Sequence, residues 1–278
     1  MLPAPLCRPR RHHLKGNHAV LDYLQTLLSE PIAFFDEAIF RVLAVLIGLC
    51  CHEWGHAYAA HCCGDDTAKR AGRLTLNPLA HLDPMGALLM FFVGFGWAKP
   101  VPVNPYRYKG NRVRADLFVS LAGITVNIIL FVLFTVACAG LSLRMWRPEV
   151  VAEYGLTTLV SYRYNAVWSV ISGTVTEDFG LLIANAWVAP LVRLCAYTAL
   201  VNLNLAVFNL IPLPPLDGYH VVNDLIFRGR FRLSQRAFQI GMLIVMVLSA
   251  QGILGRIISA VVYPAQDLLL LPIGAVWG

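Results

Sequence analysis

The stretch that decides the fold of this 278-residue chain is CCHEWGHAYAA, Cys50 to Ala60. It places His52 and His56 four residues apart and sets Glu53 beside the first of them. The residues upstream, from Val42 to Cys51, are wholly apolar. Ionisable groups inside an apolar, membrane-spanning segment are costly and are usually functional. The stretch therefore predicts a polar site within an apolar helix.

The composition indicates an integral membrane protein. Hydrophobic residues make up 58% of the chain and charged residues 14%, and the mean hydropathy is +0.63. Soluble globular proteins contain about 45–50% apolar and about 25% charged residues, so this chain lacks the polar surface of a water-soluble fold. The net charge of +6 is accounted for by basic cytoplasmic loops, and we expect no nucleic-acid partner.

Four segments are long and apolar enough to be core transmembrane helices, since a spanning helix needs about 20 mostly apolar residues. They are Ala38 to Ala60, Leu117 to Leu143, Leu181 to Leu216 and Phe238 to Tyr263. The segment Met85 to Trp97 is apolar but short, so we expect it to be re-entrant or interfacial and not to span the membrane. We predict an α-helical integral membrane protein with about four core transmembrane helices, and four to six in total.

Two connecting segments follow other patterns. Asp65 to Pro84 has turn residues at both ends and a β-prone core, Arg73 to Leu76, which predicts a short membrane-associated β-hairpin or extended edge. Trp97 to Ala115 contains three prolines that exclude a helix there. These prolines are Pro100, Pro102 and Pro105.

Loop charges predict the orientation in the membrane. Lys99 to Arg114 carries five basic residues and Arg228 to Arg236 carries four, so both loops are expected in the cytoplasm. The loop of mixed charge from Arg144 to Asp178 is expected outside. The first helix then starts outside, although the basic N-terminus should be inside. Either a further crossing lies within Ala19 to Phe35, or the charge rule fails at this end.

The HExxH pattern predicts a zinc site. Residues four apart on a helix share a face, so the imidazoles of His52 and His56 can meet one ion, with Glu53 beside them as a general base. The alternative is a pair of histidines that serve helix packing. The apolar setting argues against that alternative, because ionisable groups there are expensive.

A catalytic zinc ion needs a third protein ligand and leaves its fourth position to water. Asp217 is the best candidate, because a run of prolines breaks the third helix just before it, at membrane depth. At that depth, irregular backbone is tolerated only where other protein groups or a water-filled cavity provide partners for its N–H and C=O groups. The alternative is an ordinary helix-ending turn with a solvated aspartate. The prolines are Pro212, Pro214 and Pro215.

These motifs together resemble those of the site-2 protease family of intramembrane zinc metalloproteases, peptidase family M50. HEWGH is similar to the HExxH of the family, and NLIPLPPLDG, Asn209 to Gly218, is similar to its second signature. The resemblance covers about Ala38 to Asp224. GDDTAKRAGRLTLNPLAHLDPMG and FGWAKPVPVNP are similar to the minimal prokaryotic branch. The 35-residue loop from Arg144 to Asp178 is too short for the PDZ domain that some members carry.

The resemblance implies the roles of the site residues. One catalytic Zn²⁺ per chain would be bound by His52, His56 and Asp217. Glu53 would be the base, and Asn209 would lie near the active site and steady the substrate or the oxyanion. A weaker family pattern is matched by Gly123 and Asn127, although the usual Gly-Pro is Gly-Ile here.

By this resemblance the chain is expected to be a multi-pass intramembrane zinc metalloendopeptidase of the prokaryotic cytoplasmic membrane. It would hydrolyse peptide bonds in or near transmembrane segments of membrane proteins, in regulated intramembrane proteolysis or in the cleavage of signal-peptide remnants. Its partners would be a transmembrane protein or peptide substrate and the lipid bilayer, while the sequence leaves the oligomeric state open. An unwound substrate could pair with the edge at Arg73 to Leu76 by β-augmentation.

We divide the chain into a basic and amphipathic N-terminal segment (1–37), an intramembrane metalloprotease domain (38–264) and a C-terminal tail (265–278). Two alternatives to the protease remain. A catalytically silent zinc-binding scaffold would usually have lost the base, whereas Glu53 is present. A transporter would often show repeated halves with matching broken helices, and the sequence shows one broken helix.

Overall fold

The structure is a computed structural model, and it describes residues 27–87, 98–172, 181–231 and 233–277. These residues are mostly helical and include no β-strand. Their strand-like pairing is confined to two isolated bridges, Leu82 with Ala98 and Trp146 with Ile183. The predicted α-helical class is confirmed, whereas the predicted hairpin is not.

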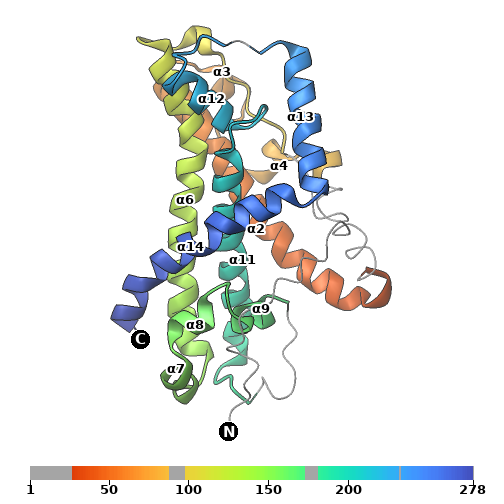
Figure 1. Ribbon diagram of the computed structural model, residues 1–278, viewed down its shortest axis with the longest axis vertical. Coiled ribbons are helices and arrows are strands. Elements are labelled where there is room, and N and C mark those ends of the chain that lie inside the picture. Colours follow the sequence, from red (N-terminus) through yellow and green to blue (C-terminus); the bar gives the residue numbers. More distant parts are fainter. Residues whose placement is uncertain (1–26, 88–97, 173–180, 232, 278) are drawn as a thin grey trace.

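Three long helices form the centre of the molecule: α2 (Pro31–Cys62), α6 (Arg112–Met145) and α11 (Ala189–Asn209). Each packs against the other two. In Figure 1, α6 and α11 run nearly parallel to the long axis and α2 crosses them obliquely. α2 begins with Pro31, which suits the first turn of a helix because its missing N–H would be unpaired there anyway. α6 begins where the Asn111 side chain accepts a hydrogen bond from the Arg114 N–H.

Three helical segments among the described residues are long and apolar enough to cross a membrane. They are Arg112–Met145, Ala186–Asn209 and Ile253–Trp277. The short 3-10 helix η2 (Ala186–Val188) continues into α11 within the second of these. The protein is therefore a membrane protein, but the predicted number of four core transmembrane helices is not confirmed.

The prediction of one helix from Phe238 to Tyr263 is wrong. That segment is divided between α13 (Gln235–Ala250) and α14 (Ile253–Trp277), which run in different directions (Figure 1). Gly252 lies between them with φ +68°, a left-handed conformation that ends a helix and that glycine adopts without steric cost.

The domain boundaries that we expected at 37/38 and 264/265 fall inside α2 and α14.

Asp65 to Pro84 forms two short helices, α3 (Thr67–Arg70) and α4 (Pro78–His81), with a bend between them, in place of the predicted β-hairpin. Side-chain hydrogen bonds to the backbone explain this, because they offer the chain an alternative to strand pairing. The carboxylate of Asp65 accepts from the N–H groups of Thr67 and Asn104. The buried Arg73 side chain donates to the Lys99 carbonyl at 2.6 Å.

Two predicted segments lie partly outside the described residues. Of Met85 to Trp97, residues 88–97 are not described, and of Ala19 to Phe35, residues 19–26 are not. The re-entrant piece and the additional crossing therefore stay predictions.

The loop that begins at Arg144 folds into three short helices, α7 (Pro148–Tyr154), α8 (Leu156–Val160) and α9 (Asn165–Ser172). They lie at the opposite end of the bundle from α12 (Asp217–Leu225), as Figure 1 shows. Side chains that are almost fully buried here include Met145, Trp146, Leu156, Leu159 and Tyr162. This end of the molecule is a packed core, and the polar site lies toward the other end.

Candidate metal centre

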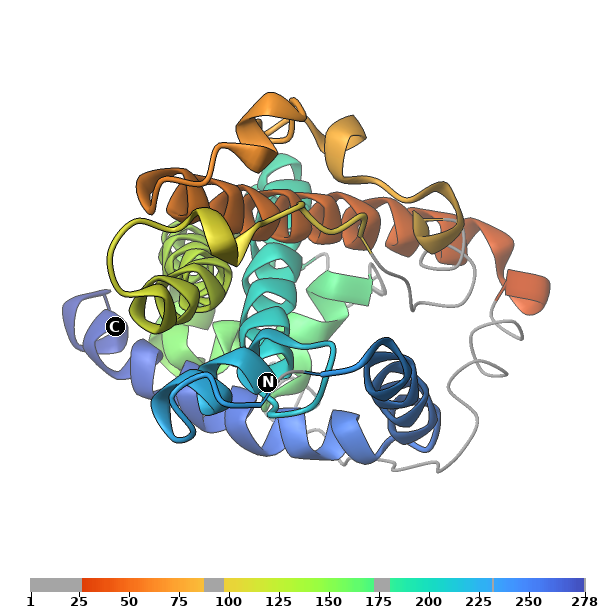
Figure 2. The same ribbon diagram turned by 90° about the horizontal axis from the view of Figure 1, so that it is seen from above.

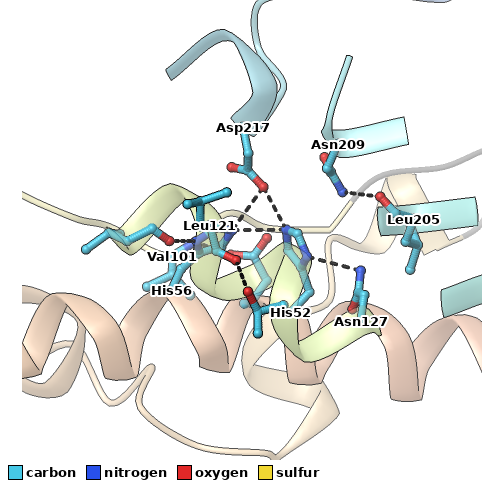
Figure 3. Close-up of polar contacts among 11 residues, drawn as sticks. His52, His56, Val101, Leu121, Asn127, Leu205, Asn209 and Asp217 are labelled. Atoms are coloured by element: carbon cyan, nitrogen blue, oxygen red, sulfur yellow. Dashed lines mark hydrogen bonds and ion pairs between the residues drawn. The ribbon is translucent and has the colours of Figure 1, made fainter. Parts of the chain in front are cut away.

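Three predicted residues meet at one point between α2 and α12. His52 and His56 project from one face of α2, and Asp217 reaches them from the first turn of α12 (Figure 3). Asp217 Oδ2 lies 3.2 Å from His52 Nε2 and 3.3 Å from His56 Nε2. The two Nε2 atoms are 3.0 Å apart. Among the described residues this is the one group of three His, Cys, Asp or Glu side chains whose ligating atoms lie close enough to hold a metal ion.

The other ring nitrogens of the two histidines are held by α6. His56 Nδ1 lies 2.7 Å from the Val119 carbonyl oxygen, and His52 Nδ1 lies 3.2 Å from the side-chain amide of Asn127. Metal-binding histidines almost always donate their second ring N–H to a carbonyl, carboxylate or water, which fixes the tautomer. Val119 provides such an acceptor directly, so Nε2 of His56 is left to face the centre.

Asn127 is completely buried, and its Oδ1 has no hydrogen-bond partner. As assigned, its Nδ2 faces His52. The oxygen and nitrogen of a side-chain amide exchange places by a simple flip, and their assignment follows from the hydrogen-bond network. A flipped Asn127 would present Oδ1 to the Nδ1–H of His52, which satisfies the orphan oxygen and directs Nε2 toward the centre. The residues therefore fit a metal ion.

Gly123 lets α6 approach the histidines closely. A Cβ atom at this position would lie 2.5 Å from His56 Nε2 and 2.7 Å from His52 Cε1. Any larger residue would occupy the space of the imidazoles. The first half of α6 therefore forms the floor of the site, and this is the physical reason for glycine at position 123.

Glu53 is tied to the extended segment that precedes α6. The Val101 N–H donates to Glu53 Oε2 at 2.7 Å, and Val101 lies between Pro100 and Pro102, which keep this segment out of a helix. One carboxylate oxygen, Oε2, is thereby oriented by the backbone.

The predicted break after the third helix is confirmed. α11 ends at Asn209, and residues 210–216 are irregular before α12 starts at Asp217. Asn209 Nδ2 donates to the Leu205 carbonyl at 3.0 Å (Figure 3). A cavity of about 420 Å³ contains all five predicted site residues in its wall. They are His52, Glu53, His56, Asn209 and Asp217.

Comparison with known proteins identifies the family. The family model described as Peptidase family M50 matches residues 40–250. This chain belongs to peptidase family M50. It is therefore an enzyme that hydrolyses peptide bonds, and with its apolar helices it is a membrane-embedded member of that family whose surroundings include lipid.

Several curated relatives of this M50 peptidase carry the name of a zinc metalloprotease. "Putative zinc metalloprotease YwhC" of Bacillus subtilis is 33% identical over 238 residues, which cover 86% of this chain and 92% of that protein. "Putative zinc metalloprotease Rip2" of Mycolicibacterium smegmatis is 28% identical, covering 84% of this chain and 75% of that protein. The protein of the same name from Mycobacterium tuberculosis is 27% identical, covering 86% and 77%. No solved structure matches the M50 peptidase.

Residues that sequence reasoning missed in this M50 peptidase act mostly through their backbone. The contacts of the Val119 carbonyl and the Val101 N–H are made by backbone groups, so the pattern of side chains in the sequence does not indicate them. Asn127 had a signal, because it belongs to a weaker pattern of the family, but that pattern assigned it no contact. Only the packing of α6 against α2 reveals that it faces His52.

Proposed function

We propose that this chain is an intramembrane zinc metalloendopeptidase of the cytoplasmic membrane that cleaves peptide bonds in or near transmembrane segments of membrane proteins. The convergence of His52 Nε2, His56 Nε2 and Asp217 Oδ2 carries the proposal. Two nitrogens and one carboxylate oxygen are the ligand set of a catalytic zinc site, which keeps a fourth position open. The names of the relatives support zinc as the metal.

The Zn²⁺ ion would be held by His52, His56 and Asp217, and when bound it would polarise the scissile carbonyl and lower the pKa of water to about 7. Glu53 would take the proton of the attacking water at Oε1 and pass it to the leaving amine, while the Val101 N–H fixes Oε2. Asn209, in the wall of the same cavity, would orient the substrate carbonyl through its amide. Its Nδ2 has two N–H donors, of which the Leu205 carbonyl takes one, so the second remains for the substrate.

A membrane setting explains why such polar groups lie among apolar helices. The carbonyls of a transmembrane helix are hidden in hydrogen bonds, so the enzyme must hold an unwound segment and bring water to it within a protected cavity. Arg73 to Leu76 forms no β-strand, and its pairing with such a segment stays a prediction. The loop charges support an arrangement in which this end of the protein faces the cytoplasm.

The proposal is tested with purified protein reconstituted in lipid vesicles, beside a single-span test substrate. Metal analysis is expected to give one zinc per chain, and the substrate is expected to be cut within or beside its span. A chelator that strips the metal should stop cleavage, and zinc should restore it. Full cleavage by metal-free protein, or zinc-loaded protein that cuts no membrane substrate, would contradict the proposal.

Gly123→Ala is expected to lower zinc occupancy strongly without unfolding the protein. Alanine is favoured over glycine within a helix by about 0.5–1 kcal/mol, but its Cβ would lie 2.5 Å from His56 Nε2. Gly140→Ala is the matched control on the same helix, because its Cβ would lie 3.6 Å from Trp277, an ordinary contact. Bound zinc per folded protein is the measurement. Equal zinc in both variants would show that α6 does not form the floor of a metal site.

Asn127→Leu is expected to weaken zinc binding about 10–100-fold, because outer partners of ligating histidines typically contribute that much. Leucine fills a similar volume but offers His52 no acceptor. Asn127→Asp keeps an acceptor oxygen and should retain more zinc than the leucine variant. Competition with a chelator of known affinity measures the effect. Unchanged affinity in Asn127→Leu would remove Asn127 from the site.

A further inference from the structure

A second cavity, of about 480 Å³, lies next to the cavity of the metal centre. The two cavities share Pro105, Asp116 and His220 in their walls. The second cavity is enclosed by the first turns of α6, by α12 and by the residues that follow α12, among them Gly229 and Phe231. A peptide held at the metal centre would therefore have a nearby side chain within reach of this second space.

The second cavity is polar along the two helices that flank it. On α12, Asp217, His220 and Asp224 follow one another at intervals of three and four residues and share one face. The metal-site cavity contains the first two, and the second cavity contains the last two. On α6, Arg112 and Asp116 are likewise four residues apart and line the second cavity. The ligand Asp217 thus stands at one end of a polar path, and Asp224 stands at the other.

Asp224, at the end of this path away from the metal centre, has incomplete hydrogen bonding. It is only 6% exposed, and its Oδ2 is buried without a hydrogen-bond partner. Burial raises the pKa of this carboxyl to about 6, and the nearby negative charge of Asp116 contributes to the rise. A buried carboxyl oxygen without a hydrogen-bond partner is costly unless a donor or cation approaches it.

The other charged groups of the cavity have contacts of their own. His220 Nδ1 lies 3.6 Å from Asp116 Oδ2. The guanidinium of Arg112 stacks over the Tyr106 ring at 4.3 Å from its centroid. Asp116 and Asp224 thus share the cavity with Arg112 and His220, and Asp224 Oδ2 is the acceptor that these contacts leave open. The cavity therefore suits an incoming group that offers N–H donors to this oxygen, such as a protonated side chain.

We propose that the second cavity is a specificity subsite for a lysine or arginine side chain in the flank of the transmembrane substrate, with Asp224 as its acceptor and Asp116 as the second carboxylate. This proposal rests on the proposed function. Lys and Arg are concentrated at the cytoplasmic ends of transmembrane segments, so such a side chain lies a few residues from bonds near that end. The subsite would position a scissile bond relative to the membrane boundary.

The experiment uses single-span peptides that are identical except at one flanking position, which is Lys, Gln or Glu. Cleavage is followed with the wild-type enzyme in vesicles, and binding of the same peptides is measured with the Glu53→Gln protein. We expect the Lys peptide to be cut and bound about tenfold better than the Gln peptide, the ratio that corresponds to one charge-assisted hydrogen bond. In Asp224→Asn this ratio should fall toward one.

Asp116→Asn is a second variant for the case that Asp224→Asn does not fold, and its ratio should fall as well. Glu149→Gln removes an exposed carboxylate of α7 at the opposite end of the bundle and should keep the tenfold ratio. Equal cleavage and binding of all three peptides, or a preference for the Glu peptide, would refute the subsite but not the proposed protease function. If the wild type cleaved none of the peptides, the proposed function would be refuted. The ratio of Lys-peptide to Gln-peptide binding would still test the subsite in that case.

Discussion

Glu53→Gln is expected to keep zinc at one ion per chain and to cleave transmembrane substrates 10²–10⁴-fold more slowly than the wild type, the typical contribution of a general base. Glutamine has nearly the same shape and keeps an oxygen that can accept the Val101 N–H. It has no basic oxygen to take a proton from water. The histidines and Asp217 are untouched, so the metal site should persist.

This outcome is measured by single-turnover cleavage of a vesicle-embedded substrate, together with zinc analysis of the same preparation. Retained zinc shows that the variant is folded at the site, so that the lost rate reports the missing proton transfer. Wild-type turnover by the glutamine variant would exclude Glu53 as the base. Loss of zinc together with activity would instead assign Glu53 a part in holding the metal.

His56→Ala and Asp217→Ala are expected to lose stoichiometric zinc and, with it, all measurable cleavage. Each change removes one of three ligating atoms that lie within 4.8 Å of one another. A direct ligand should matter more than an outer partner, whose loss already costs about 10–100-fold in affinity. Zinc per chain after dialysis against a weak chelator is the measurement.

His61→Ala provides the matched control, since His61 belongs to the same helix as His56. Its Nδ1 contacts Asp66 Oδ1 at 2.5 Å, away from the metal centre. This variant should keep its zinc and its activity. Stoichiometric zinc in both ligand variants, or equal loss in His61→Ala, would refute the assignment of the ligands.

The local parts of the site could be predicted because they depend on short-range geometry. His52 and His56 share a face since any α-helix places residues i and i+4 together, and the apolar sequence around them makes that helix. The break before Asp217 follows from the prolines, which cannot continue the ladder of hydrogen bonds. That α12 then brings Asp217 to within 3.2 Å of His52 is a result of the tertiary structure.

The two errors of the fold prediction have separate causes. At Phe238 to Tyr263 the hydropathy is continuous, so a single left-handed glycine, Gly252, decided that two helices form instead of one. At Arg73 to Leu76 the β-propensity of the residues was outweighed by distant partners. Arg73 is bound to the backbone of Lys99, a residue 26 positions away, and no local pattern encodes that contact.

By itself the sequence determined the membrane class, the paired histidines with their glutamate and the proline break that delivers the aspartate, because composition and helical periodicity are local properties. Only the tertiary structure decided which residues of α6 contact the two histidines. Gly123, Val119 and Asn127 touch the histidines only because α6 crosses α2 at this level. The second cavity beyond Asp116 and His220 arises in the same way, since its walls come from segments more than a hundred residues apart that only packing brings together.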